Sequence, residues 1–150
     1  MRVCVVGCGA VGSLFAANLA TLDDVEVWAF DLNESHVKQI KKNGLQLVGA
    51  GEVTGFPHAT SDAAELPACD FGIVATKAMH AAGAIAGTRH AFAQGAVASV
   101  MNGVGNEETL AEHVGRVIRG TTFPAGKLLE PGVVQWDVKG ETTFGPFEPR

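Results

Sequence analysis

The sequence predicts an α/β fold in which a doubly wound, mostly parallel sheet carries an antiparallel C-terminal extension. Apolar runs of strand length alternate with helical stretches over the first two thirds of the chain, as in parallel βα units. Beyond Arg116 the runs are short and separated by Gly and Pro, which is typical of antiparallel strands. For a chain of 150 residues we expect a single domain, residues 1–150.

The composition favours a small-molecule partner. The net charge is −5 and Lys and Arg are scattered, so the sequence offers no basic stripe for nucleic acid. Apolar runs stay well short of the ~18 residues of a membrane span, and the N-terminus enters a strand without a secretory leader. We therefore expect a cytoplasmic protein that binds neither nucleic acid nor membrane.

Cysteine and histidine spacing gives no indication of a metal site. Cys4, Cys8 and Cys69 lack the C-x-x-C spacing of zinc and redox sites, and we expect them to pack as small hydrophobes. The five histidines are dispersed, without a pair at ligand spacing on one expected element.

The first expected strand, residues 3–6, is a mostly β-branched run that ends in a glycine-rich turn. Gly7 permits a tight turn, Gly9 lets the backbone approach a pyrophosphate, and Gly12 lets the next helix pack close to the strand. That helix begins near Ala10, and its free amides, with Cys8 in the turn before them, favour a bound anion. The helix face expected to be apolar holds Val11, Leu14, Phe15, Asn18, Leu19 and Leu22. The pattern is that of a Rossmann-type dinucleotide-binding unit.

A second apolar strand, residues 25–30, ends in Asp31, which lies 24 residues after Gly7, near the offset expected for such a unit. In such units a carboxylate at this position accepts hydrogen bonds from the adenosine ribose hydroxyls and repels a 2′-phosphate. The alternative is that Asp31 caps the helix that begins around residues 33–35. The joint match of strand, glycines, helix and acid favours a ribose ligand.

Residues 34–42 are expected to form a helix with Val37 and Ile40 inward and a left-handed cap at Gly44. Residues 45–56 resemble a hairpin, which we expect to be a peripheral addition. A short helical turn is expected over residues 61–65.

Residues 70–75 are the next expected strand, followed by Thr76 and Lys77 and by a helix over about residues 79–92. Ligands of open parallel sheets lie outside the carboxyl ends of the strands, so Thr76 and Lys77 are placed to meet the nicotinamide half of a cofactor. A solvated loop position is the alternative for Lys77.

Residues 96–101 form another expected strand, and Asn102 follows it with a donor and an acceptor for a ligand. Asn106 is expected to be the N-cap of a helix whose first turn holds Glu107 and Glu108. Strand-like runs then follow at residues 117–123, 133–137 and 142–144, and Pro131-Gly132 indicates a turn between two of them.

Several segments together are distinctive. They are Gly7-Cys8-Gly9-Ala10-Val11-Gly12-Ser13, Ala75-Thr76-Lys77, Asn102-Gly103-Val104-Gly105-Asn106-Glu107, Gly120-Thr121-Thr122 and Pro131-Gly132-Val133-Val134. With these motifs the chain resembles, nearly end to end, the N-terminal nucleotide-binding domain of the ketopantoate reductase (2-dehydropantoate 2-reductase) family. The lysine after Thr76 and the Asn-Gly-Val-Gly-Asn loop distinguish that family from other Rossmann domains.

The resemblance implies an NAD(P)H-dependent oxidoreductase that reduces a 2-oxo acid, in the family 2-dehydropantoate to pantoate. It places Lys77 and Asn102 on the nicotinamide and substrate side, as the catalytic candidates within this chain, and adds cofactor contacts from the backbone near Ala125. The family's principal catalytic lysine and a substrate-binding acid lie on a helical domain that would follow residue 150. The turn-rich stretch 145–150 therefore leads us to expect a fragment, inactive alone, of a protein for which a homodimer is possible.

One departure concerns the cofactor. Family members that use NADP(H), the family default, place an arginine near the end of the second strand, whereas this chain has Asp31 and no nearby Arg. NAD(H) is therefore favoured. An NAD-linked dehydrogenase of another 2-hydroxy acid, or a non-catalytic NAD-binding or redox-sensing module, remain alternatives.

Overall fold

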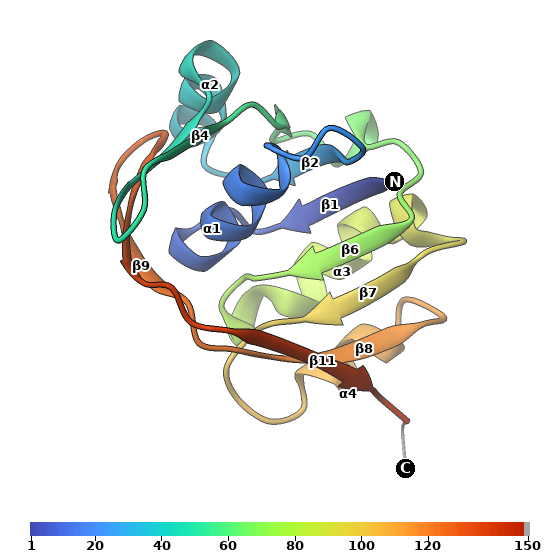
Figure 1. The fold of residues 1–150 in the computed structure, drawn as a ribbon. Coiled ribbons are helices and arrows are strands. Elements are labelled where there is room, and N and C mark those ends of the chain that lie inside the picture. The colour runs from blue at the N-terminus through green and yellow to red at the C-terminus, as the bar shows by residue number, and fades with distance from the viewer. Residues whose placement is uncertain (149–150) are drawn as a thin grey trace.

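The computed structural model describes residues 1–148 and contains two β-sheets with a helix layer between them and further helices outside (Figure 1). Pro149 and Arg150, the end of the stretch expected to be turn-rich, lie outside the described residues.

The main sheet has seven strands in the order β11-β8-β7-β6-β1-β2-β5. They are β1 (Arg2–Val6), β2 (Glu26–Phe30), β5 (His58–Thr60), β6 (Phe71–Val74), β7 (Ala96–Ser99), β8 (Val117–Thr122) and β11 (Thr142–Pro146). All neighbouring strands are parallel except β8 and β11, which are antiparallel. The strand order reverses at β1, because β2 lies on one side of it and β6 on the other, and open α/β sheets bind ligands at such a switch point. The predicted fold class is confirmed.

Helices cover both faces of the main sheet. The α-helices are α1 (Ala10–Leu19), α2 (Glu34–Asn43), α3 (Ala81–Thr88) and α4 (Asn106–Ala111), and the 3-10 helices are η1 (Ala63–Glu65), η2 (Ala78–His80) and η3 (Arg89–Phe92). Figure 1 shows α1 on one face and α3 and α4 on the other. Side chains of β1 alternate accordingly: Val3 and Val5 join the hydrophobic cluster on the α1 side, and Cys4 and Val6 join the cluster on the α3 side.

A second sheet covers the outer side of α1. Its strands are β3 (Leu45–Gly49), β4 (Val53–Gly55), β9 (Ala125–Glu130) and β10 (Val133–Val138), in the order β4-β3-β10-β9. The predicted hairpin is β3 and β4, but the expectation that it is peripheral is wrong. Leu45 and Leu47 are fully buried because β3 lies inside the second sheet and packs toward α1.

The expected apolar face of α1 is confirmed only in part, because Leu14 is buried and Phe15 and Leu19 pack against the core, while most of the fully buried positions are others. The buried residues are mostly small, namely Gly12, Ser13, Leu14, Ala16 and Ala17, and Leu22 lies beyond the helix and is 49% exposed. Because α1 lies between two sheets, small residues allow close approach on both sides: a Cβ added at Gly55 of β4 would collide with the backbone of Ala17. Small size, and not hydrophobicity alone, therefore decides which residues of this helix are buried.

Other elements follow the predictions with local differences. The helix expected over 79–92 is divided into η2, α3 and η3, and β5 and β9 were not predicted. Gly44 ends α2 with the expected positive φ of 78°, but its ψ of 178° is outside the left-handed helical region. Antiparallel pairing between two predicted runs is confirmed for β8 and β11. The turn at Pro131-Gly132 instead joins β10 to the unpredicted β9, and β8 also pairs in parallel with β7 and β10 with β3.

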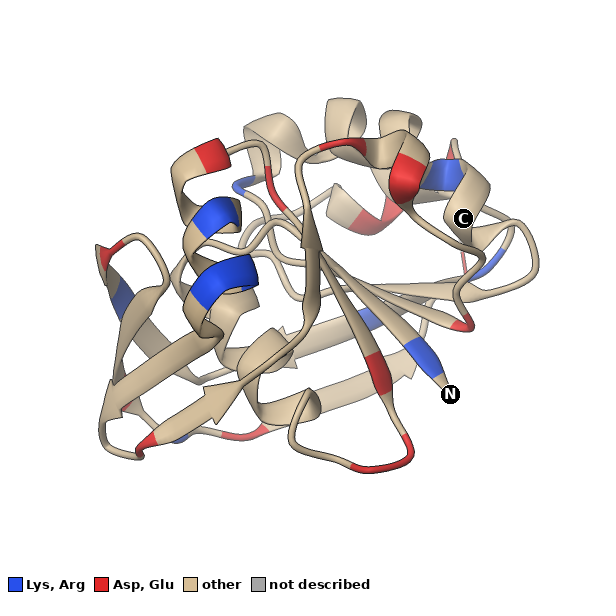
Figure 2. Ribbon diagram, turned by 90° about the horizontal axis from the view of Figure 1, so that it is seen from above, with Lys and Arg blue, Asp and Glu red and all other residues tan. Residues whose placement is uncertain are grey.

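Charged residues of both signs occur throughout the described part of the chain. Figure 2 shows Lys and Arg interspersed with Asp and Glu over the helices and strands. Within residues 1–148, the helices are all too short or too polar to cross a bilayer.

Candidate functional site

The turn between β1 and α1 has two glycines that packing requires and one that faces open space. Gly7 has a φ of 89°, and a Cβ there would lie 2.7 Å from Cγ2 of Thr76. A Cβ at Gly12 would collide with the carbonyl oxygen of Gly7. At Gly9 a Cβ would meet nothing within 4 Å. The turn therefore offers bare backbone to a ligand at Gly9, which suits a pyrophosphate beside the first turn of α1.

Asp31 follows β2 and its carboxylate lies against this turn. Its Oδ2 accepts a hydrogen bond from the backbone N–H of Cys8 at 2.7 Å, and its Oδ1 accepts one from Asn33 N–H at 2.8 Å. The N-cap of α2 is Asn33, whose side chain accepts from His36 N–H, so the capping alternative for Asp31 is wrong. Each carboxylate oxygen has a further lone pair, which leaves acceptor capacity for ribose hydroxyls.

The side chain of Cys8 points into the core although its backbone belongs to the turn. It is 1% exposed, and its Sγ lies 3.8 Å from the carbonyl oxygen of Val5. Burial, and next the negative charge of Asp31, raise the pKa of this thiol, so it stays protonated at neutral pH. Cys4 and Cys69 are likewise buried and free, which confirms the expected packing role.

Thr76 lies between the glycine turn and the loop that follows β7. It follows β6, touches Gly7 as described, and donates from Oγ1 to the Sδ of Met101, just beyond β7, at 3.3 Å. Lys77 is exposed and precedes η2. The structure therefore brings Thr76 to the turn, and leaves the Lys77 side chain at the surface.

The loop after β7 is shaped by two glycines and one buried amide. Gly103 and Gly105 have φ values of 109° and 90°. Asn106 is 4% exposed and donates from Nδ2 to the carbonyls of Asn102, at 3.0 Å, and Gly103, at 3.4 Å. The prediction that Asn106 is the N-cap is wrong: Gly105 holds that position, and Asn106, one residue later, donates to the loop. The side chain of Asn102 itself is exposed.

A cavity of about 390 Å³ adjoins this loop. Asn102 lines it together with Thr121 and the ion pair between Glu107 Oε1 and Arg119 Nε, which are 3.6 Å apart. Ala125 begins β9 and pairs with Val138 in the second sheet, so it lies outside the lining of this cavity.

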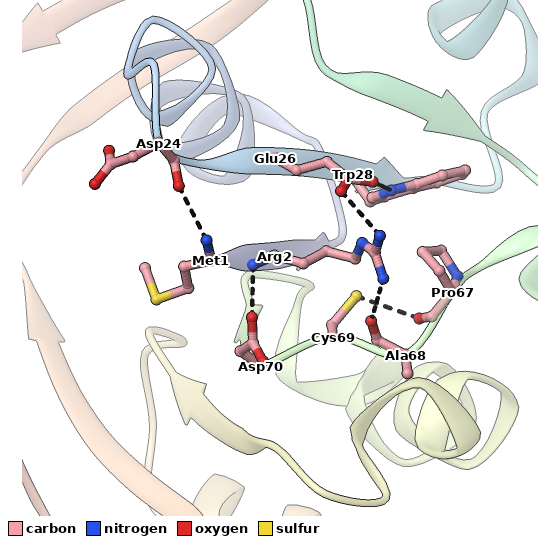
Figure 3. Close-up of polar contacts among 9 residues, drawn as sticks. All are labelled: Met1, Arg2, Asp24, Glu26, Trp28, Pro67, Ala68, Cys69 and Asp70. Atoms are coloured by element: carbon pink, nitrogen blue, oxygen red, sulfur yellow. Dashed lines mark hydrogen bonds and ion pairs between the residues drawn. The ribbon is translucent and has the colours of Figure 1, made fainter.

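A second cavity, of about 500 Å³, lies at the amino ends of β1, β2 and β6, and its lining includes Asp23, Asp24, Glu26 and Asp70. Figure 3 shows the polar contacts around Arg2 in this region. Arg2 pairs with Glu26 at 2.9 Å and donates to the carbonyl of Ala68, and its backbone N–H donates to Asp70. These contacts hold β1 between β2 and β6. The hydrogen bond from Arg2 lowers the pKa of Glu26, so this ion pair persists, and the further carboxylates Asp23 and Asp24 in the lining would repel an anionic ligand. The glycine-rich edge is therefore the better ligand site.

Two polar residues beside the turn were not predicted as site residues. Ser13 and His36 are 0% and 1% exposed and lie on α1 and α2. The sequence carries one signal, because Ser13 extends the glycine motif, whereas no local pattern around His36 indicates a role beside the turn. Within residues 1–148, His, Cys, Asp and Glu form no group of three or more arranged to hold a metal ion.

The candidate site residues that follow four adjacent strands thus lie in one row at the carboxyl ends of those strands. Across β2, β1, β6 and β7, the row runs from Asp31 through the glycine turn and Thr76 to Asn102. An elongated ligand crossing the switch point would meet a carboxylate at one end and an amide beside a cavity at the other.

Comparison with known proteins finds a matching family model and relatives that cover nearly the whole chain. Residues 3–149 match the family model described as ketopantoate reductase PanE/ApbA. The chain is 34% identical over 148 residues to 2-dehydropantoate 2-reductase of Pyrococcus abyssi, covering 98% of this chain and 48% of that protein. The corresponding enzyme of Halobacterium salinarum is 33% identical over 152 residues, covering 98% and 50%. The chain spans about half the length of the curated relatives it matches.

Solved structures show the same fold. A PanE/ApbA family ketopantoate reductase from Ralstonia eutropha JMP134 superposes with a TM-score of 0.88 and 27% identity, over 96% of this chain and 49% of that one. A ternary structure of D-mandelate dehydrogenase with NADH and anilino(oxo)acetate gives a TM-score of 0.87 and 26% identity, over 96% and 48%.

Proposed function

The chain belongs to the ketopantoate reductase family, and from this we propose that it forms the dinucleotide-binding part of an NAD(P)H-dependent oxidoreductase that reduces a 2-oxo acid. One observation carries the proposal: the carboxylate of Asp31 is hydrogen-bonded to the glycine turn, at the point where the strand order reverses. A turn, an acid and a switch point together are the requirements for a bound dinucleotide.

Each part of the row has a role in holding the cofactor. The open backbone at Gly9 and the N-terminal amides of α1 would hold the pyrophosphate. Asp31 would accept from the adenosine ribose hydroxyls. Thr76, Lys77 and Asn102 would lie along the nicotinamide half, with the backbone near Ala125 adding contacts. The cofactor, when bound, supplies hydride transfer, and the protein supplies binding and orientation.

We infer that NAD(H) is preferred to NADP(H). Asp31 places a negative charge beside the site of the ribose 2′ position, where a phosphate would be repelled. The D-mandelate dehydrogenase of similar fold was solved with NADH, which shows that this architecture accommodates the unphosphorylated cofactor in a related protein.

The substrate side lies at the cavity beside the loop after β7. The amide of Asn102, in the cavity lining, would donate to a 2-oxo acid and accept from the alcohol product. Lys77 lies outside this lining, before η2, and would supply a positive charge for the substrate carboxylate from the neighbouring strand end. The names of the curated relatives favour 2-dehydropantoate as the substrate. The similarity to D-mandelate dehydrogenase favours, as a second candidate, an NAD-linked dehydrogenase of another 2-hydroxy acid.

One experiment distinguishes these activities. The protein encoded by the complete gene is assayed for NADH and NADPH oxidation with 2-dehydropantoate and with aryl and alkyl 2-oxo acids. Reduction of 2-dehydropantoate supports the family activity, and reduction only of another 2-oxo acid supports the second candidate. Cofactor binding without oxidation of either cofactor by any 2-oxo acid would refute both and favour a non-catalytic binding module.

A further inference from the structure

His36 lies buried on α2 and links the glycine turn to the second sheet. Its Nδ1 accepts a hydrogen bond from the backbone N–H of Gly132 at 2.9 Å, and its Nε2 lies 3.3 Å from Oγ of Ser13. Ser13 Oγ in turn donates to the carbonyl oxygen of Cys8 at 2.9 Å. A continuous chain of hydrogen bonds therefore runs from the turn between β9 and β10, through His36 and Ser13, to the turn between β1 and α1.

The geometry fixes the protonation state of the ring. A backbone N–H can only donate, so Nδ1 of His36 carries no proton while it accepts from Gly132. In the neutral ring the proton is then on Nε2, which donates to Ser13. Ser13 is thereby left to donate its own proton to Cys8, in agreement with the observed distance. Each donor in this series of hydrogen bonds has an acceptor only when His36 is neutral.

The last hydrogen bond of this series, from Ser13 to Cys8, determines where one backbone amide points. The peptide between Cys8 and Gly9 is trans, so its C=O and N–H point in opposite directions. Because Ser13 holds the Cys8 carbonyl on the side of α1, the Gly9 N–H points to the other side. At Gly9 itself an added Cβ would meet nothing within 4 Å, so the backbone there has room for a ligand.

We propose that His36 is a positioning residue for the cofactor turn: as a neutral imidazole it fixes Ser13, and through Ser13 it holds the Cys8–Gly9 peptide with its N–H directed at the cofactor pyrophosphate. The inference rests on the proposed function, since it concerns the same site. It adds that the second sheet, through Gly132, takes part in shaping the site.

Protonation of His36 breaks the hydrogen bond between its Nδ1 and the N–H of Gly132. A proton on Nδ1 would face the N–H of Gly132, two donors with no acceptor between them. Gly132 cannot easily move away, because its carbonyl accepts from Gln46 of β3 at 2.9 Å and its φ is 81°. The ring must therefore shift, and its contact with Ser13 shifts with it.

The surroundings of His36 favour the neutral ring. Burial lowers its pKa, and the charge of Asp31 and the carbonyl of Cys8 act in the opposite direction. The titratable groups of the other packed elements, Glu130 beside the β9–β10 turn and His58 on β5, are exposed. Asp31 is thus the charged group that faces the ring.

The test combines nuclear magnetic resonance with calorimetry on the chain between about pH 8 and about pH 5, the range in which histidine titrates. Side-chain ¹⁵N spectra should show the Nε2–H tautomer of His36 at the upper end. As His36 is protonated, the amide signals of Gly132 and Gly9 should shift with the same midpoint. In Ser13→Ala, Gly132 should still follow His36, whereas Gly9 should no longer do so.

Calorimetry then measures NAD⁺ binding over the same range. Affinity should fall below the His36 midpoint, by up to about tenfold per pH unit if only the neutral form binds. Ser13→Ala should bind more weakly at the upper end and lose most of this pH dependence. His90→Gln, which removes an exposed histidine on η3, is the matched control and should keep the original profile.

Three results would overturn the inference. They are an Nδ1–H tautomer, a Gly9 amide that does not follow His36, and NAD⁺ affinity that stays constant while His36 titrates. In each case NAD⁺ binding at about pH 8 would leave the proposed function intact. Absence of NAD⁺ binding at every pH would instead overturn the proposed function, and this inference with it.

Discussion

The carboxylate of Asp31 accepts a 2.7 Å hydrogen bond from the backbone N–H of Cys8, so the residue that ends β2 is tied to the turn that ends β1. This bond connects the two parts of the site that a dinucleotide would touch at its adenosine end. It also means that Asp31 has a structural contact besides its proposed ligand contact. Substitutions at the turn should therefore be chosen so that an effect on NAD⁺ affinity can be distinguished from an effect on the free energy of unfolding.

Gly9 and Gly12 provide such a separation. Gly12→Ala should lower the free energy of unfolding by about 3 kcal/mol, at the upper end of overpacking costs, because the added Cβ collides with the carbonyl of Gly7. Gly9→Ala should leave folding nearly unchanged, since its Cβ meets nothing, and should weaken NAD⁺ binding by occupying the ligand's space. Denaturant unfolding and calorimetry measure the two effects. A Gly9→Ala chain that binds NAD⁺ as tightly as the unmodified chain would place the pyrophosphate elsewhere.

Asn102 and Asn106 form a second matched pair, tested in the protein encoded by the complete gene. Asn102→Ala should lower kcat while Tm changes little, because the exposed side chain is proposed to face substrate. Asn106→Ala should lower stability by about 1–3 kcal/mol, because the buried Nδ2 satisfies two loop carbonyls. Thermal unfolding and steady-state kinetics give both quantities. If Asn102→Ala loses activity only in proportion to lost stability, its role is structural.

The stability of the chain should depend on pH through His36. Burial lowers the pKa of His36 from its usual 6.5 in the folded chain, so the unfolded chain binds the proton more tightly. Stability from the neutral ring is therefore fully present above about 6.5 and is lost as pH falls toward the lower folded pKa, with a slope of at most about 1.4 kcal/mol per pH unit.

Urea unfolding at a series of pH values measures this slope. His36→Gln should flatten the dependence below the usual histidine pKa, while His90→Gln should preserve it. An unmodified chain whose stability rises on acidification through this range would contradict the buried neutral ring.

The sequence was sufficient to predict the parallel sheet, the glycine turn and the acid at the end of β2. Those features depend on local patterns: β-branched runs, glycine spacing and the residue that follows a strand. The position of Asp31 beside the turn follows from the pairing of β1 with β2, which the pattern also implied.

Long-range packing was not predictable from the same patterns. Nothing local in residues 45–56 indicates that β3 pairs with β10, more than 80 residues later, to form a sheet over α1. The buried small face of α1 follows from that sheet, and so does the role of His36, whose partner Gly132 belongs to the turn before β10. Asn106 was assigned as a cap from its type, whereas its buried amide donates to the loop behind it.

The central claim is that this chain binds a dinucleotide with Asp31 at the ribose. A 2′-phosphate about 4 Å from Asp31 would be repelled by roughly 4 kcal/mol at an effective dielectric of about 20, before screening by salt. If about 1.4 to 2.8 kcal/mol of this repulsion remains after screening by salt, NAD⁺ binds about tenfold to a hundredfold more tightly than NADP⁺.

Calorimetric titration of the chain with NAD⁺ and NADP⁺ is the most direct measurement. We predict that the unmodified chain binds NAD⁺ more tightly than NADP⁺. The difference between the two affinities should narrow in Asp31→Asn and stay unchanged in Asp23→Asn, which removes an exposed charge just before β2. Tighter binding of NADP⁺ by the unmodified chain would contradict this prediction, and would assign the adenosine end to the exposed lysines of α2, Lys38, Lys41 and Lys42.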